Sequence, residues 1–461
     1  MGDGESNEWM AAQARVERAR GLFLSGKLEE AAIELRRALA VDPDRGDWHH
    51  SLAVTLDAQG RHGEAMASYE RALELVPNHA HALIGAAQGS MRQGKPDACV
   101  AFCDRAVRID TKLEPAYSLK IMALGMLQKF DDAESTYFLA QQYLGEMPLC
   151  LAEMAHVLAA QGKFDRAIWC FRESIAQNPK IPGVKTRLGL ILLQAGQPEP
   201  AHQVLLQSLR DHPGDSRTLL ALGSALEALG RPTEAEEKYR HTVELEPANQ
   251  VAHVRLGDLA LRGGRLEEAR AAYTLVISLG LKDPAIRLRL VEVLARVGLR
   301  AEARRHLEEM FLRGSASVIR DAAVAYGAAG AALECGTPRA AVALMRMGVQ
   351  LASEDARQWT RYARALFEDG ERAAGRRAAR RALRLDRKCT ETLHNVALDA
   401  LRHSEIKRAL AAIARGLRHA PSDEGLRKLR VHAWGKRAAG QWRGVALTVR
   451  SIALAIRSLR W

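Results

Sequence analysis

Two groups of residues in this sequence have types and spacings that could support chemistry. Cys99 and Cys103 are four positions apart, so on a helix their thiols share one face and could bind a metal ion. No second pair of ligands follows at the spacing of a zinc site, which favours packing in a protein core. Histidines that could bind a metal or respond to pH lie close together at His49, His50, His79 and His81. Histidines dispersed over a surface or a groove are the favoured interpretation.

A pattern with a fixed period determines which elements carry these residues. A turn residue, usually glycine, is followed five positions later by alanine, as in Gly26 and Ala31. Nine such turn positions are spaced by 34 residues, namely Gly26, Gly60, Gly94, Gln128, Gly162, Gly196, Gly230, Gly264 and Gly298. The apolar residues between them follow a 3.6-residue period, and no run alternates as a strand does. Each unit is therefore predicted to be two antiparallel helices.

Other positions keep their chemistry relative to the turn. Nine residues beyond it, most units have a large apolar or aromatic side chain, for example Phe171, Tyr239 and Tyr273. Prolines two positions past the turn fit the first turn of a helix, at Pro96, Pro198, Pro232 and Pro338. The glycine permits a tight reversal, the alanine lets two helices approach, and the large residue fills the gap between units.

With these residue types and this spacing, the sequence resembles the tetratricopeptide repeat, a 34-residue helix-turn-helix family. The resemblance implies an all-α fold, a right-handed α-solenoid (superhelix) of about twelve repeats plus a C-terminal helical pair. We expect nine contiguous repeats at 12–317, a phase-breaking insertion at 318–321, three divergent and increasingly basic repeats at 322–423, and the helical pair at 424–461. The insertion is inferred because the turns at Gly298 and Gly336 are 38 residues apart.

The repeats leave no residues for a separate catalytic domain. The sequence also has no GxxxxGK[ST], no GxGxxG after a strand, no HExxH and no GxSxG. Members of the family that the chain resembles bind peptides or helices of other proteins in the concave groove. The resemblance therefore implies a non-catalytic scaffold or adaptor that needs no cofactor and binds protein partners.

In this family the groove is lined by the first helix of each repeat. The slot nine positions before the turn holds Arg187, Arg255, Arg289 and Arg361, and the slot six positions before it holds Asp258, Glu292 and Arg364. Arg255 with Asp258, and Arg289 with Glu292, have i,i+3 spacing, so we expect each pair to form on its own helix. In the divergent repeats the groove slots turn basic, at Arg357, Arg361, Arg364, Arg427 and Arg430.

The net charge of +12 is concentrated near the C-terminus. Residues 356–461 have 25 Lys+Arg against 9 Asp+Glu, a net +16, whereas residues 1–355 carry a net −4. An adaptor that binds polyanions or a membrane surface through this block is the alternative function. Nucleic acid is the disfavoured polyanion, because few aromatic residues are interleaved with the basic ones.

The last segment, 442–461, is predicted to be an amphipathic helix. Its basic stripe consists of Arg443, Arg450, Arg457 and Arg460. Such a helix could cap the solenoid, dock on an anionic membrane surface or mediate self-association.

The composition excludes other classes. The longest stretch without charge that we find, Ala322–Leu333, has twelve residues, against the roughly 18 or more that a membrane span needs. The acidic start, Met1–Ser6, does not have the pattern of a secretory signal peptide. Six cysteines in 461 residues are too few for a disulfide scaffold. We therefore expect reduced thiols and a cytoplasmic location.

Overall fold

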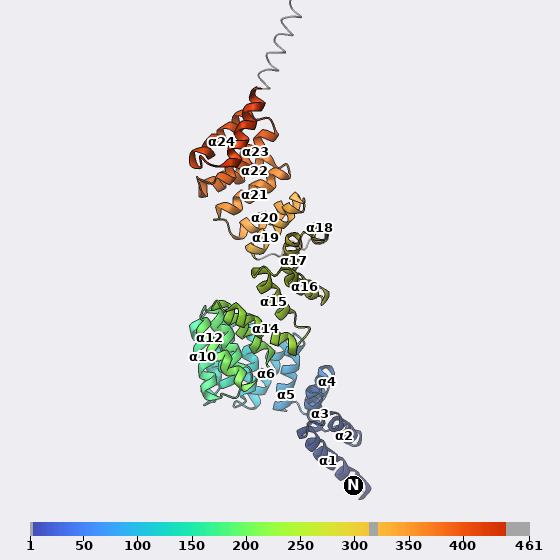
Figure 1. Ribbon diagram of the computed structural model, residues 1–461. Helices are drawn as coiled ribbons and strands as arrows, with labels where there is room; N and C mark the ends of the chain where they lie inside the picture. The colour runs from blue at the N-terminus through green and yellow to red at the C-terminus, as the bar shows by residue number, and fades with distance from the viewer. Residues whose placement is uncertain (1–2, 313–320, 439–461) are drawn as a thin grey trace, which may run out of the picture. The chain divides into compact units, whose positions relative to one another are not determined.

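The computed structural model describes residues 3–312 and 321–438, and every regular element in these ranges is a helix (Figure 1). The chain divides into two compact units, and the boundary between Lys238 and Tyr239 lies inside α14 (Pro232–Leu245). Within each unit, helices that follow one another along the chain pack side by side. The all-α solenoid predicted from the sequence is confirmed.

The helices that lie wholly in the first unit are α1 (Asp3–Leu24), α2 (Leu28–Val41), α3 (Gly46–Ala58), α4 (His62–Leu75), α5 (Ala80–Arg92), α6 (Pro96–Ile109), α7 (Glu114–Met126), α8 (Phe130–Tyr143), α9 (Pro148–Ala160), α10 (Phe164–Gln177), α11 (Val184–Gln194), α12 (Pro198–Asp211) and α13 (Ser216–Ala228).

The second unit contains α15 (Gln250–Arg262), α16 (Leu266–Ser278), α17 (Pro284–Val297), α18 (Arg300–Leu312), α19 (Ala322–Glu334), α20 (Pro338–Leu351), α21 (Ala356–Glu368), α22 (Arg372–Leu385), α23 (Thr390–Arg402) and α24 (Ile406–His419). Residues 424–438 are helical as well.

Between the two helices of a repeat, the chain reverses through a residue with positive φ. Gly162 has a φ of 76°, and a Cβ added there would meet no atom within 4 Å, so the glycine is needed for its backbone conformation alone. Gln128 (φ 58°) and Ser404 (φ 59°) adopt the same left-handed conformation with a side chain. The two turns without glycine therefore keep the geometry of the repeat.

The other positions of the period have the environments that their residue types predict. Phe171, Tyr239 and Tyr273, nine residues beyond their turns, are fully buried. The small residues five positions beyond the turn are all 1% exposed or less, namely Ala31, Ala65, Cys99, Ala133, Ala167, Ala201, Ala235, Ala269 and Ala303. Small side chains at these positions let the two helices of a repeat lie close together. The four prolines predicted for first helical turns begin α6, α12, α14 and α20.

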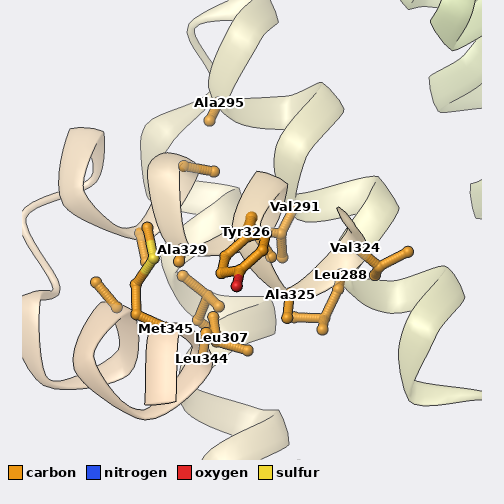
Figure 2. Close-up of a cluster of buried hydrophobic side chains, with 14 of the residues drawn as sticks. Leu288, Val291, Ala295, Leu307, Val324, Ala325, Tyr326, Ala329, Leu344 and Met345 are labelled. Carbon is orange, nitrogen blue, oxygen red and sulfur yellow. The ribbon is translucent and has the colours of Figure 1, made fainter. Parts of the chain in front are cut away.

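In the second unit, one buried cluster includes helices on both sides of residues 313–320. Figure 2 shows Tyr326 of α19 among Leu288 of α17, Leu307 of α18 and Leu344 of α20. A Cβ added at Gly348 would lie 2.3 Å from the Tyr326 ring, so α20 can approach the ring only with glycine at this position. The repeats before and after residues 313–320 therefore share one core.

Some sequence-based predictions fall outside the described residues. Of the insertion predicted at 318–321, only Asp321 is described, and its carboxylate accepts a hydrogen bond from the Ala323 N–H at the start of α19. The boundaries 12–317, 322–423 and 424–461 stay predictions. Among the described helices, none has a stretch long and apolar enough to cross a membrane.

Candidate functional site

A pocket of about 340 Å³ lies in the first unit, on the first helices of three successive repeats. Its lining residues come from α7, α9 and α11, and they are Met122, Gly125, Met126, Glu153, His156, Val157, Ala160 and Arg187. Met126 is 59% exposed, so a large apolar side chain faces solvent at the pocket. Leu190, at the position of α11 that corresponds to Met122 and His156, is 44% exposed.

Local packing brings α7 and α9 together. A Cβ added at Gly125 would lie 2.9 Å from a methyl group of Val157, so glycine permits the close approach. Glu114, at the start of α7, accepts hydrogen bonds from the backbone N–H groups of Leu149 and Cys150 at 2.5 and 3.1 Å. Burial raises the pKa of Glu114, and these two hydrogen bonds oppose the increase. The first turn of α9 is thus tied to α7.

Arg187 of α11 crosses to α9 and forms the polar side of the pocket. Its Nη2 lies 2.5 Å from Glu153 Oε1, and its Nε donates to His156 Nε2. The guanidinium carbon also lies 5.9 Å from the centre of the Phe171 ring. Because these contacts come from three directions, they fix the orientation of the guanidinium.

The buried polar groups beside Arg187 titrate away from their ordinary ranges. Burial and the Arg187 charge lower the pKa of His156 to about 4, so the imidazole is neutral near pH 7 and can accept the Nε–H. Burial raises the pKa of Glu153, while Arg187 acts in the opposite direction. The site therefore combines an apolar surface with one fixed guanidinium, which suits a peptide with an apolar side chain and a nearby acceptor.

The two groove arginines of the second unit that were predicted to pair within their own helices do not. Asp258 of α15 instead pairs with Arg289 of α17, in the next repeat, and accepts a hydrogen bond from the Tyr273 hydroxyl at 2.6 Å. Glu292 pairs with Arg296 at 2.5 Å rather than with Arg289. Arg255 is exposed. The prediction of i,i+3 pairs was wrong, because a neighbouring repeat presents a closer partner.

The basic groove slots of the divergent repeats are exposed. Arg357, Arg361 and Arg364 are three or four residues apart on α21, which places them along one side of that helix. Arg364 pairs with Glu368 at 2.9 Å. Arg427 and Arg430 are exposed on helical residues 424–438, and Arg427 Nε donates to the carbonyl of Pro421. The C-terminal stripe of Arg443, Arg450, Arg457 and Arg460 lies outside the described residues.

The cysteines and histidines noted first in the sequence lie in unit one. Cys99 and Cys103 are fully buried, with their sulfur atoms 3.9 Å apart, as the core interpretation predicts. The His50 ring lies 4.6 Å from the ring of His79 and 6.5 Å from that of His81. Burial and these two neighbours lower the pKa of His50 to about 4. In the described part of the chain, no three His, Cys, Asp or Glu residues are placed to hold a metal ion.

Sequence reasoning named Arg187 but missed the apolar part of the pocket. Met122, His156 and Leu190 occupy the slot six residues before the turn, the same slot that holds Asp258 and Glu292 in later repeats. Following that slot through the neutral repeats would have revealed them.

Models of the tetratricopeptide repeat match residues 16–80, 153–216, 186–249 and 220–284, and a further model of this repeat matches residues 56–123. No curated protein matches the chain significantly.

Three solved structures are similar to the chain at low sequence identity. The match to yeast Tom70 covers 96% of this chain and 99% of that one, with 14% identity and a TM-score of 0.36. The match to the APC/C hetero-tetramer Cut9–Hcn1 covers 90% and 95%, with 14% identity and a TM-score of 0.40. The match to TTC0263, a thermophilic TPR protein of Thermus thermophilus, covers 40% and 99%, with 19% identity and a TM-score of 0.34.

Proposed function

Because the chain belongs to the tetratricopeptide repeat family, we propose that it is a scaffold that binds partner proteins through the pocket on α7, α9 and α11. The occupant is a peptide or helical segment of the partner that inserts an apolar side chain. The proposed role is binding rather than catalysis.

The observation that carries this proposal is the exposure of Met126 beside an apolar pocket. Exposed large apolar side chains that border a pocket mark interaction surfaces more often than scattered ones do. Methionine is flexible and polarizable, so Met122 and Met126 can adapt to side chains of different shape. The corresponding position of α11 adds Leu190, which would extend the apolar surface along a bound segment.

Arg187 supports the proposal from the polar side. A guanidinium has five N–H donors, and the contacts with Glu153 and His156 use the Nε–H and one Nη2 donor. The remaining donors are available for a carboxylate or a backbone carbonyl of the partner. A segment with an apolar residue next to an acidic one therefore fits the site best.

Selection from a displayed library of random peptides, with the full-length protein as bait, tests this proposal. Peptides selected by the wild-type protein should bind Met126→Glu at least about tenfold more weakly, because burying one apolar side chain contributes roughly 1.5–3 kcal/mol. The matched control is Met10→Glu in α1, where the methionine is 55% exposed and distant in sequence. If both variants bind the peptides as the wild type does, the pocket is not the binding site.

A further inference from the structure

The second unit carries a set of exposed arginines on α22 that the proposed pocket does not use. This α22 arginine surface consists of Arg377, Arg380, Arg381 and Arg384, all exposed. The region around it is strongly basic, since residues 356–438 contain 21 Lys+Arg against 9 Asp+Glu, a net charge of +12. A surface of this kind attracts anionic partners.

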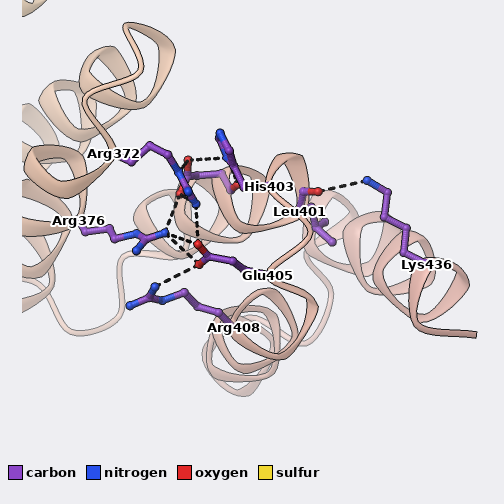
Figure 3. Close-up of polar contacts among 8 residues, drawn as sticks. Arg372, Arg376, Leu401, His403, Glu405, Arg408 and Lys436 are labelled. Atoms are coloured by element: carbon purple, nitrogen blue, oxygen red, sulfur yellow. Dashed lines mark hydrogen bonds and ion pairs between the residues drawn. The ribbon is translucent and has the colours of Figure 1, made fainter. Parts of the chain in front are cut away.

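Other arginines of the same helix already hold carboxylates. Figure 3 shows Arg372 and Arg376 of α22, together with Arg408 of α24, directed at Glu405. Their nitrogen atoms lie 2.9, 2.8 and 3.1 Å from its carboxylate oxygens. Arg372 Nε also lies 3.0 Å from the carboxylate of buried Asp399. Three guanidinium groups around one carboxylate hold the pKa of Glu405 at about 2.

The α22 arginine surface lacks such partners within the described residues, where none of its four arginines forms an ion pair. The next repeat cannot supply them, because the residues 34 positions later are Ala411, Ala414, Arg415 and Arg418. The previous repeat has Ala343, Arg346, Met347 and Gln350 at the corresponding positions. The stretches 1–2, 313–320 and 439–461 contain no Asp or Glu.

We propose that the α22 arginine surface binds a carboxylate-rich segment of a partner protein, in addition to whatever occupies the pocket of the first unit. Arg377 and Arg381 are four residues apart, a rise of about 6 Å along the helix. Carboxylates on alternate residues of an extended segment repeat every ~6.6–6.8 Å, which nearly matches this rise. Guanidinium groups pair with carboxylates through two parallel hydrogen bonds, the chemistry already present at Asp399.

The composition of the surface disfavours the other anionic partners. Single-stranded nucleic acid is bound by basic side chains interleaved with aromatic rings, and α22 has no aromatic residue. A membrane-binding helix presents a broad apolar face beside its basic one, whereas the exposed apolar residue of α22 with a large side chain is Leu385, at 38% exposure.

The test uses the full-length protein and a fluorescein-labelled peptide of alternating Glu and Ser, about 12 residues long. Binding is measured by fluorescence anisotropy at low salt. The variant Arg377→Gln, Arg381→Gln, Arg384→Gln should bind the peptide about 3- to 100-fold more weakly, as expected for three exposed ion pairs. The peptide with Gln in place of Glu should not bind, and added salt should weaken binding of the Glu peptide.

A matched control separates a local site from general attraction to a basic protein. Arg108→Gln, Arg172→Gln, Arg217→Gln removes three exposed arginines of the first unit and the same net charge. It should change the affinity less than about twofold. Equal weakening in both triple variants, or no binding of the Glu peptide by the wild type, overturns the proposal. Tighter binding of duplex DNA or of phosphatidylserine vesicles than of the peptide also overturns it.

A stability measurement shows whether the arginines have a structural role instead. Like charges four residues apart on a helix repel each other, as Arg377 and Arg381 do, and so do Arg380 and Arg384. The α22 triple variant should therefore unfold at the same temperature as the wild type or at a higher one. A clear decrease in the unfolding temperature would mean that these arginines stabilise the repeat rather than bind a partner.

Discussion

The turns at Gln128 and Gly162 should respond in opposite directions when their residues are exchanged. Both have a left-handed backbone, with φ of 58° and 76°. A residue with a Cβ pays roughly 1–2 kcal/mol for this conformation. Glycine loses instead about 0.4–1 kcal/mol of additional backbone entropy on folding. Gln128→Gly should therefore stabilise its repeat by a net ~0.5–1 kcal/mol, and Gly162→Gln should destabilise its own by a similar amount.

Sterics do not complicate this comparison, because a Cβ at Gly162 would meet no atom within 4 Å and Gln128 is exposed. A repeat array does not unfold in one step, so the assay must be local. Hydrogen exchange followed by mass spectrometry should show about two- to fivefold more protection in α7 and α8 of Gln128→Gly. Gly162→Gln should lose protection in α9 and α10 by a similar factor. A change of the same sign in both variants would refute the reasoning.

Two further predictions concern carboxylates of the second unit. Asp258→Asn leaves the half-buried Arg289 without its closest counter-charge and should cost about 1–3 kcal/mol, measured as lost exchange protection in α15 to α17, whereas exposed Arg255→Gln should have little effect. Glu405 has its pKa lowered from 4.5 to about 2 by its arginine partners, so the unfolded chain takes up this proton first as the pH falls. Helices α22 to α24 should therefore lose stability between about pH 4.5 and pH 2, and acid titration followed by circular dichroism should show a weaker dependence in Glu405→Gln.

Much of the fold could be predicted because the 34-residue period repeats the same packing problem. Each turn needs a residue that tolerates positive φ, and each helix crossing needs a small residue such as Ala167. Even the turn at Gln128 could be placed from the period, although its residue type gave no signal.

The partners of individual charged residues could not be predicted in the same way. Spacing along one helix indicated that Asp258 would meet Arg255, but the repeat that follows places Arg289 closer. The distance between side chains on neighbouring repeats depends on how the helices cross, which the sequence pattern does not specify. The pocket was missed for a related reason, since Met122 and Leu190 have the residue types of core positions and become a surface only where helices leave them uncovered.

The most direct test of the proposed binding site is photo-crosslinking from position 126 of the full-length protein. A photoreactive phenylalanine analogue replaces Met126 in one variant and Met10 in a control variant, and each is irradiated with a peptide selected by the wild-type protein. We predict a crosslink between position 126 and the apolar residue of the peptide, and none from position 10. A peptide that crosslinks from position 10 as efficiently as from position 126, or from neither position while still bound, would contradict the proposal that this pocket receives the partner.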